Sequence, residues 1–175
     1  MTQHKDDILF DNGVFPATVE DFEGVLDTAY RMADCFGFGF TNKDKEALYN
    51  RVVDAFQNGV IFVAKKDGKV VGVLALYLCR HFFDVERYYS DLFFHVHEEH
   101  RNSRYCFQLL KAAQTFVELT GRKLMINTYS PNQLDRVEKA LTRLDMKRSG
   151  GMWIYNESNL RTNNENNLNN SQETK

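Results

Sequence analysis

The stretch from Leu92 to Leu110 constrains this chain more than any other, because it combines three kinds of element within nineteen residues. A β-favouring apolar run from about Tyr88 ends at Val96, which is typical of a strand. The polar residues that follow indicate a loop, and apolar side chains at helical spacing predict a helix from Ser103 to Thr120. The start of a helix presents unpaired backbone N–H groups, so this arrangement favours the binding of an anion.

Strand and helix patterns alternate along most of the chain. Strands are predicted at residues 14–17, 60–64, 70–79, 88–96, 123–127 and 152–155, with one more short strand near 146–148. Helices are predicted to begin at Thr18, Thr41, Ser103 and Ser130, three of them with a capping-box partner three residues later. Asp67-Gly68 predicts a tight hairpin turn. This order predicts an α/β (α+β) fold with a mixed central sheet of six to seven strands and helices on both faces.

The bulk composition excludes several classes of protein. A length of 175 residues suits one domain, which we place at residues 1–155. The balance of 22 basic and 24 acidic residues does not favour general binding of nucleic acid. There is no apolar signal-peptide core at the start, and the longest apolar run is too short to cross a membrane. We therefore expect a cytoplasmic location, with Cys35, Cys79 and Cys106 as reduced and buried thiols.

The composition changes abruptly after Tyr155. Residues 156–175 hold eight asparagines and almost no apolar side chains. Such a segment cannot offset the entropy lost on ordering by burying apolar surface, so it is predicted to be a disordered tail. A tail of this kind is able to fold onto a protein partner.

One interpretation of the central stretch is a metal site. His95 and His97 lie two residues apart on a predicted strand and would face the same side, with His100 close by. The run is similar to the HxHxDH motif of metallo-β-lactamase-like hydrolases, with Glu99 in the aspartate place. Against this interpretation, no histidine follows His100, and the chain is short for the repeated halves of that fold. We therefore predict no metal.

The other interpretation is an acyl-CoA site, and it rests on a family resemblance. Arg101-Asn102-Ser103-Arg104-Tyr105-Cys106 is similar to the loop [RQ]-x-x-G-x-[GA] of the GNAT (GCN5-related N-acetyltransferase) superfamily. Val96 stands at the usual valine of the strand end, and Leu109-Leu110 match the leucines of the following helix. The resemblance covers residues 14–155. The chain departs from the pattern at Arg104 and Cys106, where the family has small residues, and it lacks the usual tyrosine of the last helix.

The resemblance implies an acetyl-CoA-dependent N-acyltransferase that transfers an acyl group directly to an amine acceptor. It implies that acetyl-CoA is held by Val96, Arg101, Asn102, Ser103, Arg104, Tyr105, Cys106 and Asn132. A backbone amide at Val96 or its neighbour would polarise the thioester carbonyl. Asp91 and His95, placed on one strand face by simple alternation, are the candidate bases, and Tyr155 is the candidate acid.

The departures from the loop pattern keep a second function open. A catalytically silent GNAT-fold protein used for binding or assembly would not need glycine at position 104. Such a protein could be virus-encoded and form part of a virion. In either case the acceptor or partner is not identified by the sequence, and a homo-oligomer is compatible with it.

Overall fold

The computed structural model describes residues 13–35, 45–80, 82, 85–127 and 134–148, with the backbone alone for residues 134–136. Five strands form one sheet in the order β1-β2-β3-β4-β5. They are β1 Val14–Pro16, β2 Val60–Lys66, β3 Lys69–Arg80, β4 Arg87–Val96 and β5 Lys123–Met125. The first four strands pair antiparallel, whereas β4 and β5 pair in parallel. The predicted mixed sheet is therefore confirmed.

The strand count differs from the prediction of six to seven. The strand predicted at residues 152–155 lies outside the described residues, as does the tail. Met146 to Arg148 are described and belong to neither a helix nor a strand, so the extra short strand predicted there was wrong.

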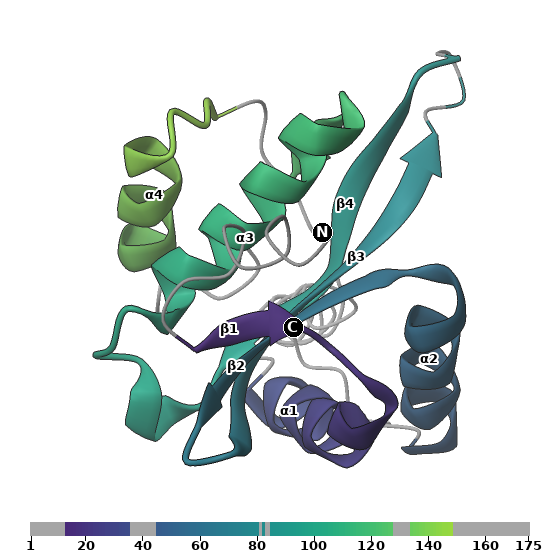
Figure 1. Ribbon diagram of the computed structural model, residues 1–175, viewed down its shortest axis with the longest axis vertical. Coiled ribbons are helices and arrows are strands. Elements are labelled where there is room, and N and C mark those ends of the chain that lie inside the picture. Colours follow the sequence, from purple (N-terminus) through teal and green to yellow (C-terminus); the bar gives the residue numbers. More distant parts are fainter. Residues whose placement is uncertain (1–12, 36–44, 81, 83–84, 128–133, 149–175) are drawn as a thin grey trace, which may run out of the picture.

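Helices cover both faces of the sheet, as predicted (Figure 1). Helices α1 (Phe22–Cys35) and α2 (Lys45–Asn58) pack on one face, and α3 (Tyr105–Thr120) and α4 (Leu134–Arg143) on the other. The central strand β3 supplies both cores, because successive side chains of a strand point to opposite faces. Val73 and Ala75 face α1 and α2, whereas Leu74 and Leu76 face α3 and α4. All four of these side chains are buried.

The turns and caps explain where the elements begin. A short 3-10 helix, η1 (Val19–Asp21), leads into α1. The Asp21 carboxylate accepts hydrogen bonds from the backbone N–H and the hydroxyl of Thr18, at 3.0 and 3.2 Å, which confirms the predicted cap. Asp67 and Gly68 join β2 to β3, with φ angles of 50° and 77° that suit a tight hairpin turn.

Two further sequence expectations can be compared with the structure. Cys35 is exposed, and Cys79 and Cys106 are half-buried, so the prediction of three buried thiols was wrong. None of these three cysteines forms a disulfide. In the described part of the chain, no helix is both long enough and apolar enough to cross a membrane.

Candidate active site

The parallel pairing of β4 with β5 stops early. Three pairs connect the two strands, and the last is Ser90 with Met125. Strand β4 continues for six more residues to Val96 while remaining paired with β3 on its other side. Beyond Ser90, therefore, no described strand pairs with the outer edge of β4. This outer edge, residues 91–96, leads directly toward the start of α3 (Figure 1).

Backbone N–H groups of β4 alternate between β3 and this unpaired edge. The N–H of His97 donates to the carbonyl of Val71, at 2.9 Å, and therefore points toward β3. In an antiparallel ladder the intervening residues direct their polar groups the other way, so the amides of Phe94 and Val96 face the unpaired edge. The carbonyl of Val96 confirms this direction, because it accepts a 3.2 Å hydrogen bond from Nε of Arg101, which lies outside the sheet. The two neighbours of Val96, His95 and His97, therefore direct their backbone N–H groups toward β3. Phe94, two residues before Val96, supplies the second backbone N–H that faces the unpaired edge.

Asp91 and Asn127 connect the two strands at the point where they separate. Oδ1 of Asp91 accepts hydrogen bonds from the backbone N–H of Asn127 at 2.7 Å and from its side-chain Nδ2 at 2.9 Å. The same Nδ2 lies 3.1 Å from Oγ of Ser90. Burial raises the pKa of Asp91, and the two hydrogen bonds from Asn127 oppose that rise only in part.

A β-bulge separates Asp91 from His95. Leu76 pairs with Asp91 and Ala75 pairs with Phe93, so Leu92 is an extra residue on β4. Asp91 therefore shares the face of Leu76, toward α3, whereas His95 pairs with Val73 and faces α1. Simple alternation had placed the two candidate bases on one face, and that prediction was wrong because the bulge shifts the alternation by one residue.

His95 occupies a buried position on the α1 face. Its side chain is buried, and Nε2 has no hydrogen-bond partner in the described part of the structure. Burial first, and then the positive charge of Arg101, lower the pKa of His95 to about 4. The imidazole is consequently neutral near pH 7 and a weak base.

The loop between β4 and α3 is held together by its own side chains. A 3-10 turn, η2 (Glu98–His100), is followed by Arg101, whose guanidinium turns back to the Val96 carbonyl and to Glu98 Oε1, at 2.6 Å. Oγ of Ser103 donates to the carbonyl of His100, at 2.5 Å, and accepts from the backbone N–H of Tyr105, at 3.2 Å. Arg101 therefore braces the loop in the structure, and its predicted contact with acetyl-CoA stays a prediction.

The start of α3 accommodates the two residues that depart from the expected pattern. Arg104 is the N-cap residue, with φ −82° and ψ −5°, a conformation open to any residue, and its side chain is exposed. Cys106 packs partly against the core under α3, and the Tyr105 hydroxyl donates to the Lys65 carbonyl at 3.4 Å. Asn102 is exposed. No position in this group needs the positive φ that would demand glycine.

The model of a known family matches residues 27–135, and its description is the acetyltransferase (GNAT) family. The match covers more than half of the chain. The chain belongs to the GNAT acetyltransferase family.

Solved GNAT-fold structures agree with this assignment at the level of the fold. The chain is similar to a predicted acetyltransferase with acetyl-CoA from Clostridium acetobutylicum, with a TM-score of 0.65 and 9% identity, over 83% of this chain and 96% of that one. It is also similar to a ribosomal-protein-alanine N-acetyltransferase from Brucella melitensis biovar Abortus 2308, with a TM-score of 0.60 and 15% identity, over 82% and 98% of the two chains. It is similar as well to an aminoglycoside 6'-N-acetyltransferase from Acinetobacter haemolyticus, with a TM-score of 0.62 and 9% identity, over 83% of this chain and 97% of that one. No curated protein matches by sequence.

Several predicted GNAT site residues can now be placed relative to one another. Val96 lies at the unpaired edge of β4, and residues 101–106 form the loop and helix start directly beyond it. Asp91 lies at the other end of that edge, and His95 lies on the opposite face. Asn132 and Tyr155 fall outside the described residues.

The three histidines of the alternative metal site, His95, His97 and His100, do not gather around a common position. Nε2 of His97 is 2.8 Å from the Thr28 hydroxyl, and the His95 and His97 ring centroids are 6.3 Å apart. His100 packs its ring against Tyr105. Throughout the described residues, no group of three His, Cys, Asp or Glu side chains is arranged to hold a metal ion.

Sequence reasoning missed two residues of this candidate site. The amide of Phe94 was not singled out, because its outward direction depends on the register with β3. Asn127 was seen only as the end of a predicted strand. A polar residue at the end of an otherwise apolar strand is a weak signal, and its partner Asp91 lies 36 residues away.

Proposed function

We propose that this protein is an acetyl-CoA-dependent N-acyltransferase that transfers an acyl group directly to an amine acceptor. The observation that supports it most is the unpaired edge of β4, where the amides of Phe94 and Val96 point outward just before the start of α3. An extended chain such as pantetheine can add to this edge through amide hydrogen bonds, as a strand adds to a sheet. A compartment that supplies acetyl-CoA, such as the cytoplasm, is part of the proposal.

The helix start fits the diphosphate of the cosubstrate. The first turn of α3 offers backbone N–H groups that have no carbonyl acceptor within the helix, together with the positive end of its dipole. The exposed guanidinium of Arg104 stands at the same point and is able to form charge-assisted hydrogen bonds with phosphate oxygens. We propose that this guanidinium replaces contacts that a glycine backbone makes in other family members.

Direct acyl transfer requires the protein to position the two substrates and to stabilise the charge that develops during the reaction. When the amine attacks the thioester carbonyl carbon, a C–N bond forms and the C–S bond breaks. The amide of Phe94 or Val96 would donate to the carbonyl oxygen as negative charge develops on it. The proton lost by the amine balances the proton gained by the CoA thiolate, so no further reactant is needed.

Asp91 is the better placed of the two candidate bases. It begins the unpaired edge, and burial raises its pKa, which strengthens a carboxylate as a base. His95 faces the opposite side of the sheet, and its pKa of about 4 makes it a poor base. We also propose Tyr155 as the acid that protonates the leaving CoA thiolate.

Binding of the cosubstrate is the first test. Acetyl-CoA in large excess over its dissociation constant should stabilise the folded protein by about 2–3 kcal/mol through mass action, seen as a rise in Tm. Release of CoA thiol in the presence of a panel of small amines and N-terminal peptides then tests transfer. If neither acetyl-CoA nor CoA raises Tm at millimolar concentration, the proposal is wrong.

Arg104 allows a sharper version of the binding test. Arg104→Gly restores the residue of the family pattern at an N-cap position, where glycine costs only a few tenths of a kcal/mol. We expect acetyl-CoA to bind about tenfold more weakly, as for loss of one charge-assisted hydrogen bond. Arg122→Gly removes an exposed guanidinium beyond the other end of α3 and should leave affinity unchanged. Tighter binding to Arg104→Gly would show that the arginine obstructs the site.

A further inference from the structure

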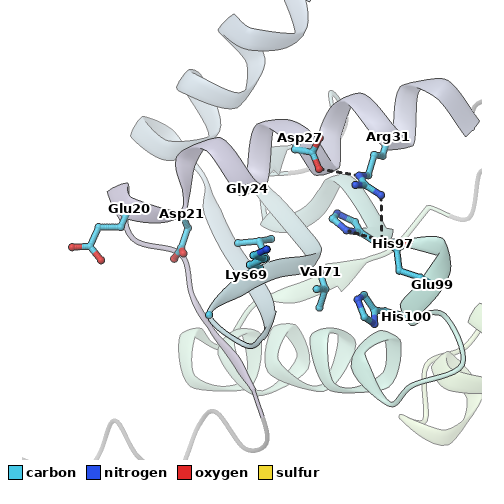
Figure 2. Close-up of a pocket in the computed structure, with 12 residues that line it drawn as sticks. Glu20, Asp21, Gly24, Asp27, Arg31, Lys69, Val71, His97, Glu99 and His100 are labelled. Carbon is cyan, nitrogen blue, oxygen red and sulfur yellow. Dashed lines mark hydrogen bonds and ion pairs between the residues drawn. The ribbon is translucent and has the colours of Figure 1, made fainter.

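A pocket of about 440 Å³ lies away from the unpaired edge of β4. It is an open pocket, lined by residues of η1, α1, the turn between β2 and β3, the start of β3 and the segment that follows β4 (Figure 2). Its volume falls within the range of about 300–1,000 Å³ that is usual for small-molecule sites. Asp91, Phe94, Val96 and Asn127 do not line it, so it is separate from the proposed acyl-transfer site.

The floor of the pocket includes a buried histidine whose tautomer is fixed by its neighbours. The hydroxyl of Thr28 has one proton, and it donates that proton to the carbonyl of Gly24 at 2.8 Å. Nε2 of His97, 2.8 Å from the same hydroxyl, must therefore carry a proton and donate it. Nδ1 of His97 is then left with a bare lone pair.

That lone pair is available to a ligand. His97 is only 5% exposed and lines the pocket. Oε1 of Glu99 lies 4.0 Å from Nδ1, beyond hydrogen-bonding distance. Burial, and then the charge of Arg31, lower the pKa of His97, so the ring is neutral near pH 7. A ligand that meets Nδ1 must donate a hydrogen bond.

Charge in the pocket favours a cationic donor. Four carboxylates and two cations line it, which gives a formal charge of −2 with neutral histidines. Arg31 is shared between Asp27, at 2.9 Å, and Glu99, at 3.4 Å, so this trio keeps one negative charge (Figure 2). The Asp21 carboxylate is balanced by Lys65 at 2.7 Å, outside the lining. Lys69 therefore faces an excess of negative charge.

We propose that this pocket binds a small aliphatic primary amine as its ammonium ion, which donates to Nδ1 of His97 and places its charge beside Glu99. Val70 and Val71 form the apolar wall that an alkyl chain would cover. The residues of the proposed acyl-transfer site do not line this pocket, so we place the ammonium ion in a binding site that is separate from the acceptor subsite. Because Glu99 and His100 also belong to the loop before α3, ligand binding here would act on the segment that holds the cosubstrate.

The test is titration of the full chain with n-butylamine near neutral pH, without acetyl-CoA. Calorimetry gives the affinity, and the ¹⁵N shift of His97 Nδ1 in NMR reports the new hydrogen bond. We expect saturable binding that 1-butanol and butyrate do not reproduce. Omitting acetyl-CoA keeps the result independent of the proposed acyltransferase activity.

Matched variants test whether each side chain strengthens or weakens the binding of butylamine. His97→Gln places an amide N–H near the position of Nε2, so it can still donate to Thr28, but it removes the acceptor at Nδ1. This change and Glu99→Gln should each weaken binding of butylamine by about tenfold or more. Lys69→Gln removes a competing positive charge and should tighten binding. Glu118→Gln, an exposed carboxylate near the end of α3, should have no effect.

Three outcomes would overturn the proposal. The first is absence of saturable binding of butylamine at millimolar concentration. The second is equal binding to the wild type, Glu99→Gln and Lys69→Gln, which would indicate non-specific association. The third is preferred binding of butyrate that weakens in Lys69→Gln, which would make the pocket an anion site. Glu99 and Lys69 are exposed, so their variants should fold even if His97→Gln does not.

Discussion

The backbone N–H of Asn127 donates a 2.7 Å hydrogen bond to Oδ1 of Asp91, just past the last pair between β4 and β5. The side chain of Asn127 donates to the same oxygen at 2.9 Å. The two strands are thus joined by a side chain at the point where their backbones stop pairing. This contact sets where the outer edge of β4 becomes available, and with it the positions of the amides of Phe94 and Val96.

Asp91→Asn separates the two roles that this residue has in our proposal. The amide oxygen can still accept from the Asn127 N–H, whereas the base is lost. We expect kcat for acetyl transfer to fall by at least about 100-fold, with little change in acetyl-CoA affinity. If kcat is unchanged and only cosubstrate affinity falls, Asp91 positions the strands and is not the base.

The same variant carries a stability prediction. The pKa of Asp91 is raised in the folded state, so its contribution to stability is largest below the ordinary carboxyl pKa of 3.8 and is lost as pH rises above that value. Asp91→Asn removes a partly buried charge and should flatten this part of the pH profile. Chemical unfolding measured from acidic to neutral pH checks it. A steeper loss of stability toward neutral pH in the variant would contradict the argument.

His95 should make the protein less stable in mild acid. Its pKa is about 4 in the folded state and near 6.5 when unfolded, so its contribution is present above pH 6.5 and is lost as pH falls toward 4. Between pH 7 and pH 5 this amounts to about 2 kcal/mol of unfolding free energy. His95→Leu should remove this part of the difference in unfolding free energy between pH 7 and pH 5, and urea unfolding at both pH values would detect the change. An unchanged difference between the two pH values would show that His95 is not buried as described.

Arg101 should act on cosubstrate binding through the loop. Its guanidinium contacts the Val96 carbonyl and Glu98, so Arg101→Ala should destabilise the protein by about 1–2 kcal/mol. Faster hydrogen exchange at residues 97–104 should accompany a lower affinity for acetyl-CoA. Arg122→Ala, an exposed arginine beyond the far end of α3, is the comparison. If Arg101→Ala lowers affinity with no change in exchange or stability, the side chain contacts the ligand directly.

Gly72 should resist any larger side chain. It pairs with Val96, and a Cβ at this position would lie 3.1 Å from Cγ2 of Val96 and 3.2 Å from Cδ1 of Leu109. Gly72→Ala should therefore cost about 1–3 kcal/mol through overpacking. Adding Val96→Ala removes the methyl group and should recover part of the loss. A double variant less stable than the sum of the two single changes would contradict this account, and denaturant unfolding of all three variants measures it.

Much of the fold could be predicted from local signals. The alternation along β3, with Val73 and Leu74 facing different helices, follows from a period of two in an apolar run. The hairpin turn at Asp67-Gly68 and the cap at Thr18 are short-range features that depend on residues at most three positions apart. The strand, loop and helix from residue 88 to 120, and the family to which they belong, were likewise set by neighbouring residues.

The chemistry of the sites depended on contacts that no local pattern encodes. The bulge at Leu92 exists only in the pairing with β3, and it moves Asp91 and His95 to opposite faces. The tautomer of His97 is fixed by Thr28, 69 residues earlier in the chain. The sequence by itself determined which elements form and in which order, because propensity and periodicity act between near neighbours. Only the tertiary structure decided which polar atoms meet, because their energies arise between segments far apart in the chain.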